Sequence, residues 1–73
     1  MFIKLHYAIP IRSSVECGKQ FTLNADSIEK YEEEALWVDN RPAAAFTIVR
    51  LKDGNEIKVY EHASAIDKVL KAK

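Results

Sequence analysis

The chain has 73 residues, of which 48% are hydrophobic, with two Gly, two Pro and one Cys, and its 11 basic and 11 acidic residues cancel to a formal charge of zero. This composition predicts one folded domain over residues 1–73 with a small core. The single cysteine excludes an intrachain disulfide, and no run approaches the roughly 18 apolar residues that a membrane span requires. The zero formal charge argues against nucleic acid as a partner.

Apolar side chains recur at every second position near the N-terminus, at Ile3, Leu5, Tyr7 and Ile9. This period predicts a strand over residues 2–9 with these side chains inward, and Pro10 ends or edges it because proline cannot donate a ladder hydrogen bond. The same alternation lacks the continuous apolar core of a secretory signal, so we expect the reducing cytoplasm as the location.

The next segment predicts a connection or hairpin followed by a second strand. Polar residues 12–14 and the pair Cys17-Gly18 are typical of a connection, and residues 20–24 alternate again with Phe21 and Leu23 inward. Gly18 and Gly54 are both interpreted as turn residues, which leaves no glycine-rich phosphate loop.

Residues 25–45 admit two interpretations. Asp26 and Glu29 have the positions of helix-capping residues, and the run 32–36 has high helix propensity, so the local pattern favours a helix near residues 28–38. Residues 40–45 would then be a loop. The acidic run is interpreted as a solvated face.

Residues 46–61 predict a hairpin around Asp53-Gly54-Asn55. A two-residue loop would place Arg50 in the apolar row opposite Ile57. A three-residue loop over 53–55, with Asn55 in the left-handed conformation, keeps the apolar rows intact and is the register we predict. Its pairs are Leu51 with Ile57, Val49 with Val59, and Lys52 with Glu56.

A short helix is predicted over residues 63–72. Ser64 and Asp67 have capping-box spacing, and the sequence has an apolar stripe and C-terminal lysines. The stripe is Ile66, Val69 and Leu70, and the lysines are Lys68, Lys71 and Lys73. Because so short a helix is marginal alone, we expect it to cover an open face or end of the sheet.

Four blocks of the sequence match, in the same order along the chain, the sequence pattern of a known protein family. They are residues 3–5, 21–32, 47–54 and 58–59. In these blocks the chain resembles the small FlbD-type flagellar and swarming motility proteins. The resemblance implies that residues 28–38 form a strand after a tight turn at 24–27, and we follow it over the helix propensity. The expected fold is therefore α+β and mostly β, either a small strongly bent antiparallel sheet or an SH3-like barrel, with a C-terminal helix.

The chain departs from that family's pattern in three places. Residues 8–19 form a longer connection than the family's short turn, and residues 35–45 look like an insertion. The segment from Val59 to Ser64 has two extra residues before the serine.

Residues that could carry chemistry are few and widely spaced. His6, His62 and Cys17 have no metal-ligand spacing, and no nucleophile pattern accompanies Cys17. We therefore expect no catalytic residue, no metal and no cofactor, and a chain that is not an enzyme.

The stretch 37–42 is the strongest binding candidate, because Trp and Arg are enriched in binding hot spots. We name Trp37, Asn40, Arg41 and Tyr31 as candidate partner-binding residues, with Trp37 as a core residue the alternative. The resemblance implies an accessory protein that acts through protein contacts. The alternative is a phage or mobile-element module that forms a homo-oligomer and binds a host protein or holds a small ligand between subunits.

Overall fold

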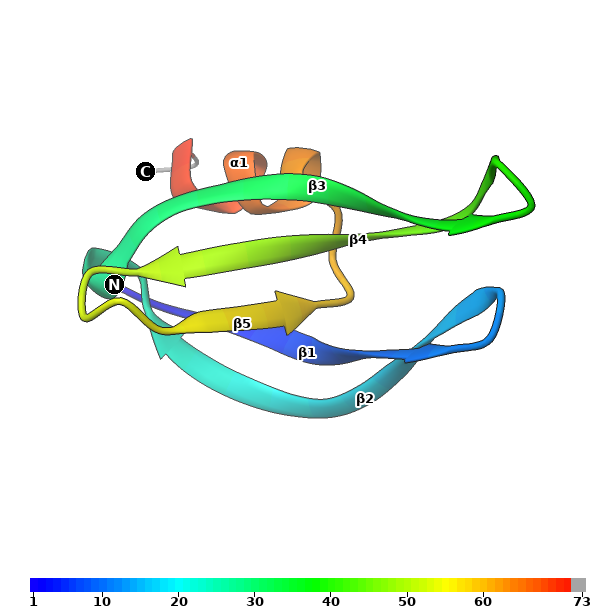
Figure 1. Ribbon diagram of the computed structural model, residues 1–73. Coiled ribbons are helices and arrows are strands. Elements are labelled where there is room, and N and C mark those ends of the chain that lie inside the picture. The colour runs from blue at the N-terminus through cyan, green and yellow to red at the C-terminus, as the bar shows by residue number, and fades with distance from the viewer. Residues whose placement is uncertain (72–73) are drawn as a thin grey trace.

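The computed structural model describes residues 1–71 and contains one five-stranded antiparallel sheet with one α-helix (Figure 1). The elements are β1 (Phe2–Ile11), β2 (Ser14–Asn24), the 3-10 turn η1 (Ala25–Ser27), β3 (Ile28–Val38), β4 (Arg41–Leu51), β5 (Glu56–Val59) and α1 (Ala63–Lys71). The strand order is β2-β1-β5-β4-β3. The mostly β, α+β prediction is confirmed; because the sheet is not closed, the bent sheet is the correct alternative and the barrel is wrong.

Two long hairpins dominate the sheet. We call residues 8–17, around the β1–β2 turn, the first arm, and residues 35–45, around the β3–β4 turn, the second arm. Figure 1 shows both turns at the same end of the molecule, beyond the end of β5. The two arms coincide closely with the two longest departures from the motility-protein pattern. The remainder of the sheet and α1 form what we call the body.

β3 is a strand along its whole length, as the resemblance implies. It pairs with β4 from Ile28 opposite Leu51 to Val38 opposite Arg41. The helix interpretation of this segment is wrong, and so is the loop at residues 40–45, because β4 begins at Arg41. Helix propensity is worth only tenths of a kcal/mol per residue, and pairing with a complete neighbouring strand outweighs it.

The first hairpin is longer than predicted. β1 continues to Ile11, with Pro10 opposite Val15 inside the ladder, and β2 begins at Ser14 rather than at residue 20. The predicted connection is thus reduced to a tight turn in which Arg12 has a positive φ of 56°. Pairing across the whole hairpin satisfies backbone groups that a long loop would leave to solvent.

Gly18 lies within β2, so its interpretation as a turn residue is wrong. His6 faces Gln20 and Ala8 faces Cys17, which leaves two residues of β2 opposite Tyr7 and defines a β-bulge. A Cβ on Gly18 would lie 3.0 Å from Ile9 Cδ1 and 3.0 Å from the Tyr7 carbonyl oxygen. Glycine is therefore favoured here by close approach of the neighbouring strand.

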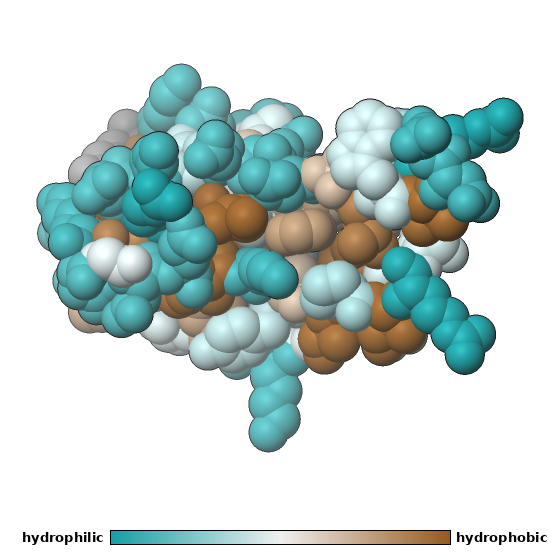
Figure 2. Space-filling model, viewed as in Figure 1, coloured by the Kyte–Doolittle hydropathy of each residue, from teal (hydrophilic) through white to brown (hydrophobic). Residues whose placement is uncertain are grey.

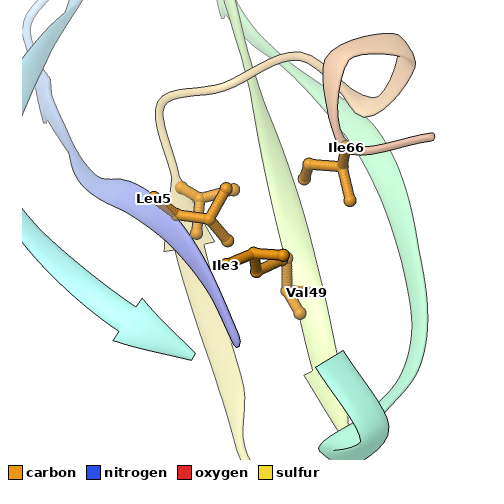
Figure 3. Close-up of a cluster of buried hydrophobic side chains, with 5 residues drawn as sticks. Ile3, Leu5, Val49 and Ile66 are labelled. Atoms are coloured by element: carbon orange, nitrogen blue, oxygen red, sulfur yellow. The ribbon is translucent and has the colours of Figure 1, made fainter. Parts of the chain in front are cut away.

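The core lies between the sheet and α1 (Figure 3). Its buried members are Ile3, Leu5, Val49, Val59 and Ile66. Phe21 and Leu23 pack against this cluster, which confirms their predicted inward orientation. Tyr7 and Ile9, predicted as core, are each 44% exposed, because α1 does not extend over that part of β1.

The final hairpin has a three-residue loop, as predicted, but the loop is residues 52–54 instead of 53–55, closed by a hydrogen bond from the Leu51 N–H to the Asn55 carbonyl oxygen at 2.8 Å, so the predicted register is wrong. Val49 faces Ile57 and Thr47 faces Val59, a shift of two residues that preserves the buried face. Gly54, with φ of 94°, takes the left-handed position predicted for Asn55, since glycine adopts it without steric cost.

Helix α1 is confirmed, although its predicted cap is wrong. The helix begins at Ala63 and the His62 carbonyl accepts from the N–H of Ile66 at 3.1 Å, so Ser64 lies inside the helix. Ile66 is fully buried and Leu70 packs on the core, but Val69 is 47% exposed. The predicted helical residue 72 and the lysine at 73 lie outside the described residues.

Candidate functional site

The end of the molecule formed by the two arms exposes large apolar side chains. We define the arm surface as Ile9 and Ile11 of β1 with Trp37 and Val38 of β3. Each is between 38% and 63% exposed, with Trp37 the most exposed of the four. Figure 2 shows hydrophobic (brown) surface at this end, with polar side chains beside it.

The exposure follows from the lengths of the elements. A nine-residue helix spans about 14 Å, whereas an 11-residue strand spans about 36 Å, so α1 covers less than half of the sheet's length. Ile9 and Ile11 follow Ile3 and Leu5 at two-residue spacing, which places them on the same face of β1. The apolar row therefore begins under α1 and continues beyond it.

Three of the four predicted site residues lie together at the tip of the second arm. Trp37 faces Pro42, Val38 faces Arg41, and Asn40 occupies the turn with a φ of 63°. Asp39 also has a positive φ, of 53°, so the two-residue turn has both central residues left-handed. The structure places Trp37 outside the core cluster and on the surface, at 63% exposure.

Tyr31 lies apart from this group, in the body. Its hydroxyl donates to the Asp67 carboxylate of α1. The pKa of Tyr31 is raised, chiefly by this hydrogen bond and to a smaller extent by burial and by the negative charge of Asp67. Tyr31 therefore fixes α1 against β3, at a distance along the strand from Trp37.

Sequence reasoning missed the contribution of the first arm. The sequence pattern predicts a core position for Ile9 and no role for Ile11, because alternation identifies the apolar face of a strand without showing where the helix that covers it ends. The unusual length of the connection after β1 was the available indication that this region differs from the body.

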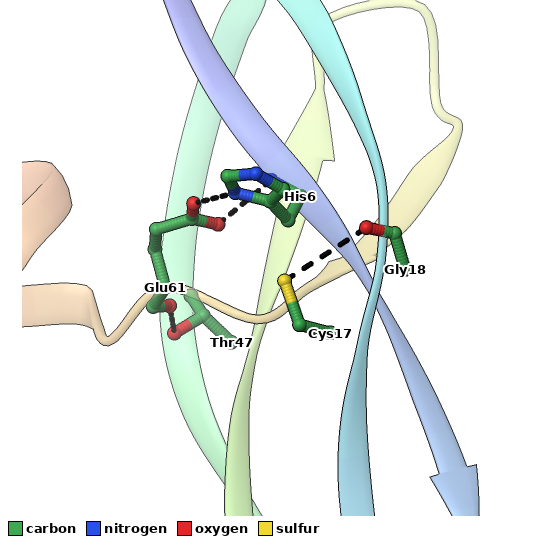
Figure 4. A network of polar contacts seen from close by, with 5 residues as sticks. All are labelled: His6, Cys17, Gly18, Thr47 and Glu61. Carbon is green, nitrogen blue, oxygen red and sulfur yellow. Dashed lines mark hydrogen bonds and ion pairs between the residues drawn. The ribbon is translucent and has the colours of Figure 1, made fainter.

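A polar cluster in the body joins β1 and β4 to the segment that leads into α1 (Figure 4). The His6 backbone N–H donates to Glu61 Oε1 at 2.8 Å, and His6 Nδ1 lies 2.7 Å from Glu61 Oε2. The buried Thr47 hydroxyl donates to the Glu61 carbonyl oxygen at 2.6 Å. Burial opposes ionisation of Glu61, but the hydrogen bonds from His6 outweigh it and lower the pKa of Glu61.

This cluster links strands and does not resemble a nucleophilic site. The exposed Cys17 faces the carbonyl oxygen of Gly18, at 3.8 Å from Sγ, rather than an imidazole nitrogen. His62 lies near Glu33, at 3.4 Å from Nδ1 to Oε1, on the solvated edge of β3. The hydrogen bonds of the cluster hold β1 and β4 to Glu61, in the segment between β5 and α1.

Residues 1–71 contain neither a metal-ligand cluster nor a cavity. No three His, Cys, Asp or Glu side chains in that part of the chain converge as metal ligands, and it contains no pocket. No helix of the described residues has the length and apolar character to cross a membrane. The arm surface is a group of exposed apolar side chains, of the kind that contacts other molecules.

Comparison of the chain with models of known protein families, with curated proteins and with solved structures gave no match.

Proposed function

We propose that this chain is a small, non-enzymatic accessory protein that binds a protein partner through the arm surface. The observation that carries the proposal is Trp37, which is 63% exposed at the tip of the second arm and lies opposite Pro42, the neighbour of Arg41 in β4. Trp and Arg are among the residue types most enriched in binding hot spots.

The size of the apolar surface supports contact with another protein. Trp37 and Val38 are consecutive in β3 and point to opposite faces, so at most three of the four side chains share a face. The exposed parts of three such side chains amount to roughly 300 Å², on the scale of the largest apolar patches of monomeric proteins. A stable interface buries about 800 Å² per partner, so the arm surface would supply less than half and its polar rim the remainder. Asn40 and Arg41 belong to that rim.

The resemblance to flagellar motility proteins fits a division of roles within the sheet. The blocks that carry the resemblance lie in the body, and the two longest departures lie mainly in the arms. We propose that the body supplies an accessory-protein scaffold of that kind and that the arms determine which partner it binds. Neighbouring genes test the motility assignment: flagellar genes support it, and phage genes favour the mobile-element alternative.

Capture of partners from the native cell tests the role of Trp37. We expect tagged wild-type chain to retain a reproducible set of proteins, and Trp37→Ala to lose them. Phe2→Ala is the matched control, because Phe2 is 71% exposed at the other end of β1. Thermal unfolding of both variants verifies that each is folded. Equal retention by Trp37→Ala and wild type would refute binding through the arm surface.

A further inference from the structure

The two edge strands of the sheet differ in their charge. β3 carries five charged residues, which are Glu29, Lys30, Glu32, Glu33 and Glu34, whereas β2 carries only Glu16 and Lys19 over the same length of 11 residues. An unpaired edge is a template for another strand, and proteins commonly protect such edges with charge. β3 is protected in this way, and β2 is not.

The bulge in β2 gives its two charges a particular arrangement. Glu16 faces Ile9, while Gly18 and Lys19 together oppose Tyr7. Ile9 and Tyr7 are two residues apart on β1, so they share a face. Glu16 and Lys19 therefore lie on the same face of β2, although their odd spacing in an unbroken strand would place them on opposite faces.

We propose that β2 pairs antiparallel with β2 of a second copy of the chain, around a two-fold axis at Cys17, with the bulge residues Gly18 and Lys19 counting as one position of the ladder. In this register Glu16 of each copy lies opposite Lys19 of the other. The edge is thus self-complementary, as a two-fold interface requires, and opposite charges directly across a strand pair stabilise it.

The alternative edge pairings are less favourable. Two β3 strands would bring glutamates together, and like charges across a strand pair are destabilising. A β2–β3 contact would leave a free edge on each end and would generate an open assembly instead of a closed dimer. Trp37 lies on β3, at the opposite edge of the sheet from β2, so substitution of Trp37 tests the proposed partner site separately from the β2 pairing.

Charge reversal with rescue tests the pairing. Size-exclusion chromatography with light scattering and sedimentation equilibrium, under reducing conditions, should show a wild-type dimer. Glu16→Lys and Lys19→Glu should each weaken dimerisation by about tenfold or more, since each creates two like-charge contacts. The double variant should restore the wild-type dissociation constant. Both residues are exposed, so folding should persist, and circular dichroism verifies it.

Three outcomes of this experiment would overturn the proposal: a wild-type monomer at all concentrations, a mass that grows without limit, or a double variant as weak as the singles. Trp37→Ala should leave the dimer intact, which separates this interface from the proposed partner site.

Cysteine cross-linking gives an independent measure of register. Cys17 lies at the proposed axis, directly opposite Cys17 of the second copy, and the two Cα atoms would be about 5.5 Å apart, within disulfide range. Mild oxidation should therefore cross-link the wild type rapidly. A Cys17→Ser/Thr22→Cys variant places the thiols about 30 Å apart in this register and should not cross-link. Equally rapid cross-linking of both proteins would refute the register.

Discussion

The body and the arms are built from the same strands but differ in what covers them. Ile3 and Leu5 are 4% and 3% exposed beneath α1, whereas Ile9 and Ile11, further along the same face of β1, are 44% and 42% exposed. A β-strand pattern thus specifies which face is apolar, and the length of the covering helix decides how much of that face is buried. What remains is available to another molecule.

The two regions also differ in how they are held. In the body, Ile66 fills the core and polar links fix the helix and its linker, including Tyr31 to Asp67 and Thr47 to Glu61. The outer parts of the arms depend chiefly on pairing within each hairpin. Segments with few buried contacts open locally at low free energy, so we expect amide hydrogen exchange to be slow in the body and fast at both arm tips.

The largest expected effect is the difference in unfolding free energy between an Ile→Ala substitution in the body and the same substitution in the first arm. Ile66→Ala removes a side chain that is 1% exposed and should lower the free energy of unfolding by about 2–5 kcal/mol through lost burial and cavity formation. Ile11→Ala, its matched control on the first arm, should cost less than about 1 kcal/mol. Urea denaturation measures both. Similar losses at the two sites would show that the arm is packed as tightly as the body.

The next effect is the pH dependence contributed by Glu61. Its pKa is lowered in the folded protein from the ordinary value of 4.5, so its contribution to stability is present above pH 4.5 and is lost as the pH falls through the folded pKa. Glu61→Gln retains an acceptor for the His6 N–H but cannot ionise. We expect the variant to lose about 1–2 kcal/mol at pH 7 and to approach wild type in acid.

Urea titrations at several pH values measure this contribution. The difference in the free energy of unfolding between wild type and Glu61→Gln should shrink steadily below pH 4.5. A difference independent of pH would mean that the carboxylate charge contributes nothing and that Glu61 acts only through its shape and its backbone.

Most of the body was predictable from sequence, and the failures have identifiable causes. Period-two patterns located the core residues of β1 and the final hairpin, and the apolar stripe located α1. The hairpin register could not be obtained from apolar rows alone, because a shift of two residues leaves both faces unchanged. The register is distinguished by Gly54, which accepts a positive φ, and by the Arg50–Glu56 ion pair.

The arms were less predictable because their strands depend on pairing with distant segments. Residues 32–36 favour a helix locally, and only the partner strand β4 makes them extended. At the candidate site, the pattern identified Trp37, Asn40 and Arg41, which the fold keeps together because they flank one turn. Ile9 and Ile11 come from a hairpin more than 20 residues away, and no local pattern connects them to Trp37.

A third prediction concerns the turn of the body hairpin. Gly54→Ala should lower the free energy of unfolding by about 1–2 kcal/mol, because an L-residue is strained at φ of 94°. The site is open, with no atom within 4 Å of an added Cβ, so the loss would reflect backbone conformation alone. Asn55→Ala provides the comparison for the register that was predicted from sequence. If Asn55→Ala were the more costly variant, the left-handed residue would be Asn55.

The smallest global effect is expected from the same kind of strain in the second arm. Asn40 has a φ of 63°, and Asn tolerates this conformation better than Ala does. Asn40→Ala should therefore strain the turn, but the arm tip can open without disturbing the core, and this opening limits the loss of global stability to about 0.5 kcal/mol. Hydrogen exchange at residues 35–45 should accelerate while the body remains unchanged. A global loss as large as that of Gly54→Ala would show that the arm unfolds only together with the body, and the division into two regions would then describe exposure but not stability.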